Sequence, residues 1–485
     1  TVGENCVNQL AAGLYSYMFP TDSKAFELRV DDSQLAENED VKQWLHKTTD
    51  IIHYHLIQSN FRQAFFENLK SLVLFGTSCF YSEEGISQVL DFTNFHMASI
   101  YVDVNSKWNV DTVFRRIKYN ARQAVQEFGK DNLGEKILAA YKDPKKQGET
   151  FSFIHAVYPR KEADGKNIDP LTMDYASKYV YEDEKIIVHE GGYAEFPHQV
   201  PRFDRDATEK YGRGPMMKEL MDIKMLSDMK VVRIKAWEKM CDPPIVLPDD
   251  GSVWPLATQP GGVIHMTPGG EPPFWFEFKG DLNKLNEAIE VTTTDIRNGF
   301  FLNLFELPEL PHPKMTATEV IRRTEQKMRS LTPIIGRLQS ELFNPLVHRI
   351  IGILLRREAI PPMPQVLAGQ EYRVEYLGPL ALAMRTLESQ GFVRTMEELK
   401  LSFGEVERLE YLDNFDIDEV SRSLSRNNGV PETWLKDEGI RDAERQEAAR
   451  KQQAMEIFFR FIVRAYSITF TGIPSLRLNC PAMTS

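Results

Sequence analysis

The first 208 residues mix two periods of hydrophobic and polar positions, and this predicts a domain of helices and strands together. Apolar residues recur three and four positions apart where helices are expected, and they alternate with polar residues where strands are expected. The predicted helices are 5–18, 40–58, 60–75, 112–128 and 133–142. The predicted strands fall in 26–30, 78–104 and 150–200, with turns at 182–184 and 191–192. Residues 1–208 are therefore predicted to form one α/β domain.

The middle of the chain reads as two helices on either side of a stretch rich in proline and glycine. Residues 216–240 contain neither Gly nor Pro, and a second helix is predicted over 282–301 after Asp281, a favourable N-cap. Between them, 242–281 holds eight of the 27 prolines and six of the 28 glycines, which is typical of loops and hairpins. Because long structureless loops are uncommon inside compact domains, a small folded lobe is favoured over a plain interdomain loop.

The second half of the chain is predicted to be mainly helical. After a proline-rich interruption, a long helical pattern runs over 317–357 and is itself interrupted at Pro333 and Pro345. Residues 372–377 alternate like a strand, which we expect to return to the sheet of the first domain. The region 379–455 is again helical in pattern. The predicted fold class is therefore α+β, mainly helical.

Composition and motifs narrow the function. The formal net charge is -12, whereas proteins that hold nucleic acid statically usually present a basic surface, so a DNA partner would be guided rather than held. The four cysteines fit no zinc spacing, and no GxxxxGKS/T or GxSxG motif occurs. No signal peptide and no uncharged apolar run of membrane-span length is present. We therefore expect no enzyme activity, no catalytic residue, no metal, no cofactor and no membrane partner.

Several short motifs spread along the chain carry a family resemblance. Two of them precede the first long helix, Phe-Pro-His-Gln-Val-Pro-Arg-Phe at 196–203 and Tyr-Gly-Arg-Gly-Pro at 211–215. The others lie at 242–251, 315–320, 336–342, 344–346, 412–416 and 429–431. Together they resemble the head-to-tail connector, or portal, proteins of short-tailed bacteriophages, whose members often carry Trp where Phe203 stands. The resemblance covers about residues 5–455.

The resemblance implies a portal fold that assembles as a ring, usually of twelve subunits. Its parts would be an α/β wing, a two-helix stem, a small α/β clip, a tunnel loop and a helical crown. On this sequence they correspond to the wing at 1–208, the stem helices at 209–241 and 282–301, the clip at 242–281, the tunnel loop at 302–316, a long kinked helix with a return strand at 317–385, and the crown at 386–455, with 456–485 unassigned.

The same resemblance implies a location and a set of partners. The ring would sit at one capsid vertex of the virion after assembly in the cytoplasm of the host bacterium, and double-stranded DNA would pass through it during packaging and ejection. The other implied partners are further copies of this chain, the large subunit of the terminase, the major capsid protein, the scaffolding protein and tail adaptor proteins.

The second stem helix has two chemically different faces. Its apolar residues share one face because they are spaced by four or seven: Leu285, Ile289, Ile296 and Phe300. The opposite face carries the expected DNA-channel residues: Asn283, Glu287, Glu290 and Thr294. In a ring, the apolar faces could pack between subunits, and repeated glutamates would repel DNA phosphates from every wall of the channel. The alternative is an ordinary solvated helix face.

Two further sets of residues are candidates for contacts. The tunnel-loop candidates are Phe305, Glu306, Leu307, Pro308, Glu309, Leu310, Pro311, His312, Pro313 and Lys314. Their prolines would stiffen a loop that projects into the bore, although an ordinary linker is the alternative. The clip candidates are Trp254, Phe274, Trp275 and Phe276. A segment this short cannot bury all four aromatic side chains by itself. They would therefore pack against neighbouring clips or dock the packaging motor and tail.

Two other classes of protein are considered beside the portal. The first is a head–tail adaptor or scaffold protein of the virion that forms no channel, which would lack the inserted helix–lobe–helix. The second is a nuclease, which would cleave plasmid DNA in the presence of metal. Ring size and a through-hole in electron micrographs would separate the portal from the adaptor, and we expect no metal-dependent cleavage of plasmid DNA.

Overall fold

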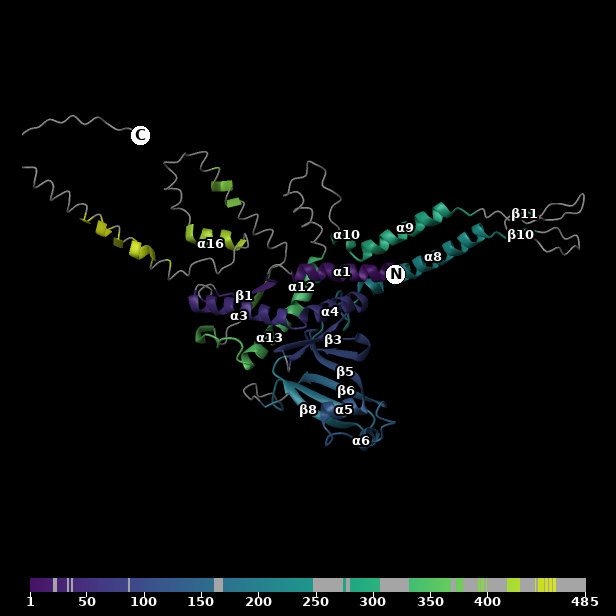
Figure 1. Cartoon of the computed structure of the whole chain (residues 1–485), viewed down its shortest axis with the longest axis horizontal. Helices are drawn as coiled ribbons and strands as arrows, with labels where there is room; N and C mark the ends of the chain where they lie inside the picture. The colour runs from purple at the N-terminus through teal and green to yellow at the C-terminus, as the bar shows by residue number, and fades with distance from the viewer. Residues whose placement is uncertain are drawn as a thin grey trace, which may run out of the picture. The chain divides into compact units, whose positions relative to one another are not determined.

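The computed structural model of the chain divides into two compact units, Thr1–Ala381 and Leu382–Ser485 (Figure 1). In the first unit the structure describes residues 1–20, 24–32, 35, 38–85, 88–160, 169–246, 274–275, 280–305, 331–367 and 372–377. In the second unit it describes residues 391–392, 394–396, 398, 417–427, 441, 444–448, 450–451, 453–455 and 457–458.

Helices form the core at the N-terminal end of the first unit. They are α1 (Val2–Met18), α3 (Glu39–Gln58) and α4 (Phe61–Phe75). Apolar residues at helical spacing bury one face of each helix, among them Leu10, Ile52 and Phe65. Helix α4 ends at Gly76 in the left-handed conformation that glycine adopts at helix ends. All three helices and the stop at Gly76 were predicted from the sequence.

A five-stranded antiparallel sheet follows, in which neighbours along the chain are neighbours in space. Its strands are β4 (Ile100–Val104), β5 (Val110–Asn120), β6 (Thr150–Pro159), β7 (Tyr175–Tyr181) and β8 (Ile186–Tyr193). The helices α5 (Ala121–Phe128) and α6 (Glu135–Lys142) lie against this sheet (Figure 1). They pack on Phe153, Tyr181 and Val188, so this part of the chain has a hydrophobic core of its own.

Two details of the sequence prediction in this sheet are wrong. The helix expected over 112–128 begins only at Ala121, because residues up to Asn120 belong to β5. The spacing of Val113 and Ile117 fits a helix and a strand equally well, and pairing with both β4 and β6 decides for the strand. The turn expected at 191–192 lies within β8, where a side chain on Gly192 would lie 2.2 Å from the Pro170 carbonyl.

Two smaller sheets join distant parts of the chain. They are β3–β2–β9, from Leu90–Phe95, Cys79–Glu84 and His198–Gln199, and β1–β12, from Phe26–Val30 and Tyr372–Tyr376. The antiparallel pairing of β1 with β12 confirms that the predicted strand returns to the first domain. Helix α3 covers the other edge of β1, since Thr49 and His53 accept hydrogen bonds from the backbone amides of Leu28 and Ala25.

The inserted hairpin predicted from the middle of the chain is present. Its helices are α7 (Pro215–Lys218), α8 (Leu220–Cys241), α9 (Leu282–Gly299) and α10 (Leu302–Phe305). Helices α8 and α9 lie side by side, and the short antiparallel pair β10 (Ile245–Val246) and β11 (Phe274–Trp275) lies beyond their far ends (Figure 1). Asp281 caps α9 by accepting hydrogen bonds from the amides of Asn283 and Lys284, as its position predicted.

The described part of the predicted long helix contains an irregular turn. It consists of α12 (Thr332–Leu338), the π-helix η2 (Gln339–Phe343) and α13 (Asn344–Arg356). Pro333 lies in the first turn of α12, where the missing amide costs no helical hydrogen bond. Pro345 follows the π-helix directly, so its missing amide leaves one carbonyl of that helix without the usual donor. In the second unit, the described segments are helical, as predicted, and include α16 (Ile417–Asn427), where Asp418 pairs with Arg441 and Arg445.

Candidate functional site

Helices α8 and α9 form a hairpin that is held together by an apolar seam. Leu226 of α8 and Ile289, Ile296 and Phe300 of α9 are buried in the same hydrophobic core. The apolar face of α9, which the sequence suggested could pack between subunits, therefore packs inside the chain. The physical reason is that α8 runs alongside it and supplies the matching apolar face.

The opposite face of α9 is exposed and polar. Asn283, Glu287, Glu290 and Thr294 are all exposed, as their helical spacing predicted. The Thr294 hydroxyl donates to the Glu290 backbone carbonyl at 2.9 Å, so it stays close to the helix. Both glutamate side chains are exposed, so they can face whatever lies opposite this surface.

Helix α8 exposes apolar side chains on two further surfaces. The first, the methionine flank, consists of Met221, Met225 and Val232 and borders a shallow groove of about 530 Å³ that Leu285 of α9 also lines. The second, the aliphatic flank, consists of Leu220, Val231 and Ile234.

The two flanks lie on different sides of α8, and the methionine flank is the one next to α9. At about 100° per residue, the methionine flank lies roughly 100–140° around α8 from Leu226 in one direction. The aliphatic flank lies roughly 80–140° from Leu226 in the other direction. Met221 is 73% exposed and Val232 is 54% exposed, which is unusual for large apolar side chains gathered on one helix.

Glycines allow the base of the hairpin to pack tightly. The Thr77–Arg202 bridge, the Phe203 amide on the Gly76 carbonyl and the Gly212 amide on Thr77 join α4 to the segment before α7. A side chain on Gly76 would lie 2.3 Å from the backbone nitrogen of Gly214. This close approach explains the two motifs at 196–203 and 211–215: they form the anchor of the hairpin.

We expect Gly76→Ala to lower the free energy of unfolding by about 2–4 kcal/mol, because it adds a backbone clash to a left-handed conformation. Gly148 is the control, since its φ is not positive and nothing lies within 4 Å of an added side chain. Gly148→Ala should change the free energy of unfolding by less than about 1 kcal/mol. Urea unfolding of both variants measures the difference, and equal losses would contradict the close-packing argument.

A buried arginine ties this base to the π-helix. Arg202 is 2% exposed, and its guanidinium makes two hydrogen bonds to the Glu341 carboxylate, at 2.7 and 3.2 Å. The Arg202 backbone amide also donates to Glu341, at 2.9 Å. The remaining guanidinium donors reach the carbonyls of Trp108 and Lys210. Arg202 thus connects its own segment with two segments that are distant in sequence, at Trp108 and at Glu341.

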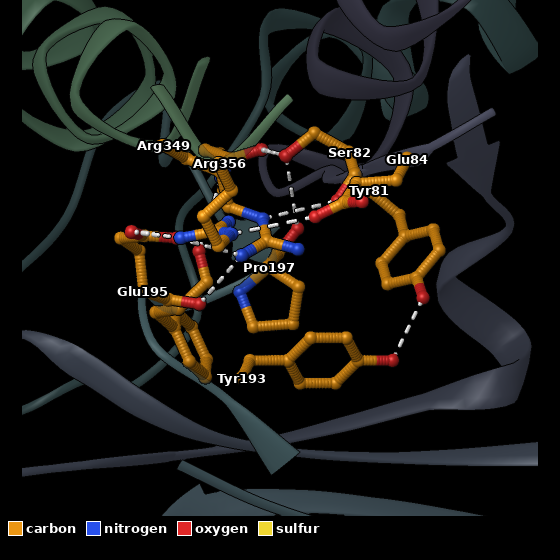
Figure 2. Close-up of polar contacts among 10 residues, drawn as sticks. Tyr81, Ser82, Glu84, Tyr193, Glu195, Pro197, Arg349 and Arg356 are labelled. Atoms are coloured by element: carbon orange, nitrogen blue, oxygen red, sulfur yellow. Dashed lines mark hydrogen bonds and ion pairs between the residues drawn. The ribbon is translucent and has the colours of Figure 1, made fainter. Parts of the chain in front are cut away.

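A second buried arginine, Arg349, lies on α13 (Figure 2). Arg349 is 3% exposed and donates to the Ser82 carbonyl, the Glu195 carbonyl and the Glu195 carboxylate at 3.0–3.2 Å. Arg356 binds the same carboxylate at 2.6 and 3.0 Å. Burial lowers the pKa of Arg349, and the charge of Glu195 opposes that shift. A buried charge is tolerated when it is paired and hydrogen-bonded, as the Arg349 guanidinium is here.

These buried charges were missed from the sequence. Arg202 was quoted only as part of a motif, and Arg349 stands among the apolar residues of α13 without any local signal of a partner. Their acidic partners lie 139 and 154 residues away in the chain. The one available signal was a charged residue at a core position of a helix, which is rare unless it is paired.

One cysteine–histidine pair resembles a catalytic arrangement but is built as part of the core. Cys79 Sγ lies 3.6 Å from His198 Nδ1, and both residues are buried. Burial raises the pKa of Cys79 to about 12 and holds the pKa of His198 well below its usual value. A nucleophilic cysteine needs a thiolate and usually a cationic neighbour, and this environment opposes both.

Most of the remaining candidate residues lie outside the described part of the chain. Those outside are Trp254, Phe276 and 306–314. Phe274 is 58% exposed and pairs through its backbone with Val246, and Trp275 pairs with Ile245. Phe305 is the last residue of α10. Among the described residues no group of three metal-ligating side chains occurs, and each described helix is too short or too polar to span a lipid bilayer.

The architecture defines a class of protein: a mixed helix-and-sheet body that carries an inserted helical hairpin with exposed apolar flanks and a polar face. A model of the family described as bacteriophage head to tail connecting protein matches residues 1–435, and the chain belongs to this family.

Two curated proteins are similar over nearly the whole chain. A probable portal protein of Bordetella phage BPP-1 is 27% identical over 461 residues, which covers 94% of this chain and 82% of that protein. The portal protein of Salmonella phage epsilon15 is 27% identical over 464 residues, covering 92% of this chain and 82% of that protein. These similarities support the interpretation as a portal, a virion component, over that of a separate head–tail adaptor.

Proposed function

We propose that copies of this chain close into a ring, usually of twelve, whose α8–α9 hairpins surround a channel for double-stranded DNA at one capsid vertex. The observation that carries the proposal is the chemistry of the hairpin. It has one apolar seam inside the chain, two exposed apolar flanks and a separate acidic face. In a closed channel the seam would hold each hairpin together, the flanks would contact the neighbouring copies, and the acidic face would line the bore.

The two flanks support a ring rather than a two-fold dimer. A cyclic ring requires two different surfaces on each copy, one for each neighbour, whereas a two-fold interface uses one surface twice. The methionine flank, which borders α9 beside Leu285, and the aliphatic flank are different surfaces of α8. In the proposed ring, the methionine flank of one copy packs against the aliphatic flank of the next.

The exposed face of α9 then lines the channel. Glu287 and Glu290 would recur in every copy and form two acidic bands around the DNA. Repulsion from all sides centres the duplex, and the DNA slides easily because no lysine or arginine contact to phosphate must break at each step. The acidic net charge of -12 agrees with a protein that guides DNA without holding it.

We extend the same proposal to the other parts of the chain. Residues 1–208 serve as the wing, 242–281 as the clip and 386–455 as the crown, with 302–316 as a tunnel loop in the bore. The clip docks the terminase large subunit during filling and tail adaptor proteins afterwards, and the body contacts the major capsid and scaffolding proteins. Assembly takes place in the host cytoplasm, and the work is mechanical rather than catalytic.

The channel is tested by reversing its charge. We expect the double variant Glu287→Lys and Glu290→Lys to form normal rings but to package DNA several-fold more slowly, because each lysine adds a phosphate contact that must break. The measurement is the length of DNA packaged per unit time in an in vitro packaging reaction.

A charge-matched control uses exposed acids elsewhere, Asp131→Lys and Glu149→Lys. This control should package DNA at the normal rate. Normal packaging by the α9 double variant, in rings confirmed by electron microscopy, would contradict the proposed acidic lining.

A further inference from the structure

The long helix of the body contains a π turn at the point where it meets the base of the hairpin. The backbone amide of Asn344 donates to the carbonyl of Gln339, five residues earlier, instead of the usual four. Helices on both sides are regular, α12 before it and α13 after it. Single π turns of this kind are rare, and they are frequently found at functional sites.

Three charged side chains project from this helix onto one extended segment. Glu341 binds Arg202, Arg349 binds Glu195, and Arg356 binds Glu195 as well. The partners occur in the reverse order, so the helix and the segment 195–202 run antiparallel. A side chain on Gly352 would lie 2.1 Å from the Glu195 carboxylate, which shows how closely this carboxylate packs against the helix.

A regular α-helix would not align the three charges. At about 100° per residue, Arg349 and Arg356 lie within roughly 20° of one another. Glu341, eight residues before Arg349, would be turned roughly 80° away. A π turn absorbs about one extra residue, equivalent to roughly 100° of rotation, and about half of it falls after Glu341. The π turn therefore brings Glu341 to within roughly 30° of Arg349.

We propose that the π-helix Gln339–Phe343 is a joint that locks the long helix to the base of the hairpin, because its extra residue aims Glu341 at Arg202. Glu341 and Arg202 are thus positioning residues. Their pair fixes the segment that leads from the five-stranded sheet into α7, and Arg349 with Glu195 fixes the other end. Conversion of the π turn to an α turn would rotate Glu341 away and leave the buried Arg202 without its carboxylate.

In the observed π state the helix is joined to the segment before the hairpin at two points, by the Arg202–Glu341 pair and by the Arg349–Glu195 pair. This inference concerns the single chain, so it depends on neither the ring nor the DNA channel.

The test combines deletion of Ser340, which is exposed, with Glu341→Gln, followed by amide hydrogen exchange on the full chain. Deletion of one residue within the π turn restores regular α spacing and keeps the flanking helices in register. Each single change should speed exchange at the amides of 202–213 by roughly tenfold or more, because a buried arginine loses its partner. The double variant should exchange no faster than either single variant, since both remove the same contact.

Three results would overturn the proposal. The first is an unchanged exchange rate at 202–213, and the second is an equal increase in the exchange rate of α5 and α6. The third is a double variant whose exchange rate at 202–213 rises by the product of the two single increases. The equal increase would indicate general destabilisation, and the multiplied effects would show that the π turn and Glu341 act independently. Glu182→Gln is the control, because it breaks the exposed ion pair with Arg116 within the sheet and should leave 202–213 unchanged.

Discussion

Replacing Met225 and Val232 by glutamate is expected to leave the chain folded but to abolish ring assembly. Both side chains are exposed in the single chain, at 43% and 54%, so the substitutions cost little stability there. In the proposed ring they are buried against the next copy. Each buried, unpaired carboxylate would cost several kcal/mol at every interface, far more than a marginal interface of this kind can absorb.

The measurement is the mass of the particle in solution, by light scattering coupled to size-exclusion chromatography. Lys235→Glu is the control: it is exposed on the same helix, outside both flanks, and it changes the net charge by the same two units. The control should assemble normally. Rings formed at normal yield by the double variant would show that the methionine flank is not an interface.

Replacing Arg349 by methionine should cost about 3–5 kcal/mol of unfolding free energy, because each buried acceptor left without a donor costs roughly 1–3 kcal/mol. The backbone carbonyls of Ser82 and Glu195 both lose their donor, whereas the Glu195 carboxylate keeps its hydrogen bonds to Arg356. Urea unfolding is best measured in the Met225→Glu and Val232→Glu background, since assembly would otherwise add to the apparent stability.

Arg357 provides the comparison within the same stretch of chain. It pairs with Glu84 but is 49% exposed, so Arg357→Met should cost about 1 kcal/mol or less. If both substitutions had the same small effect, the buried cluster in Figure 2 would contribute no more than a surface ion pair.

Local patterns in the sequence were sufficient to predict the hairpin. The spacing of Ile289, Ile296 and Phe300 gave the buried face of α9, and Asp281 gave its first residue. The exposed face with Glu287 and Glu290 followed from the same periodicity. Its role as a channel wall stays a prediction, because it depends on neighbouring copies.

The features that the sequence did not reveal depend on contacts between distant segments. Strand β5 was mistaken for a helix because Val113 and Ile117 satisfy both periods, and only its neighbours β4 and β6 decide the matter. The Arg202–Glu341 pair joins residues 139 positions apart, and the π turn that aims Glu341 changes the register of a pattern that otherwise looks regular. No short-range rule contains such information.

The pairing of β1 with β12 also determines when the body can finish folding. The ribosome makes strand β1 long before its partner Tyr372–Tyr376, and Trp44 likewise waits for the carbonyl of Pro361. Contacts of such long sequence separation form late. A nascent or truncated chain therefore lacks a complete body, so unfinished copies are poorly suited to joining an assembly in which every copy must fit two neighbours.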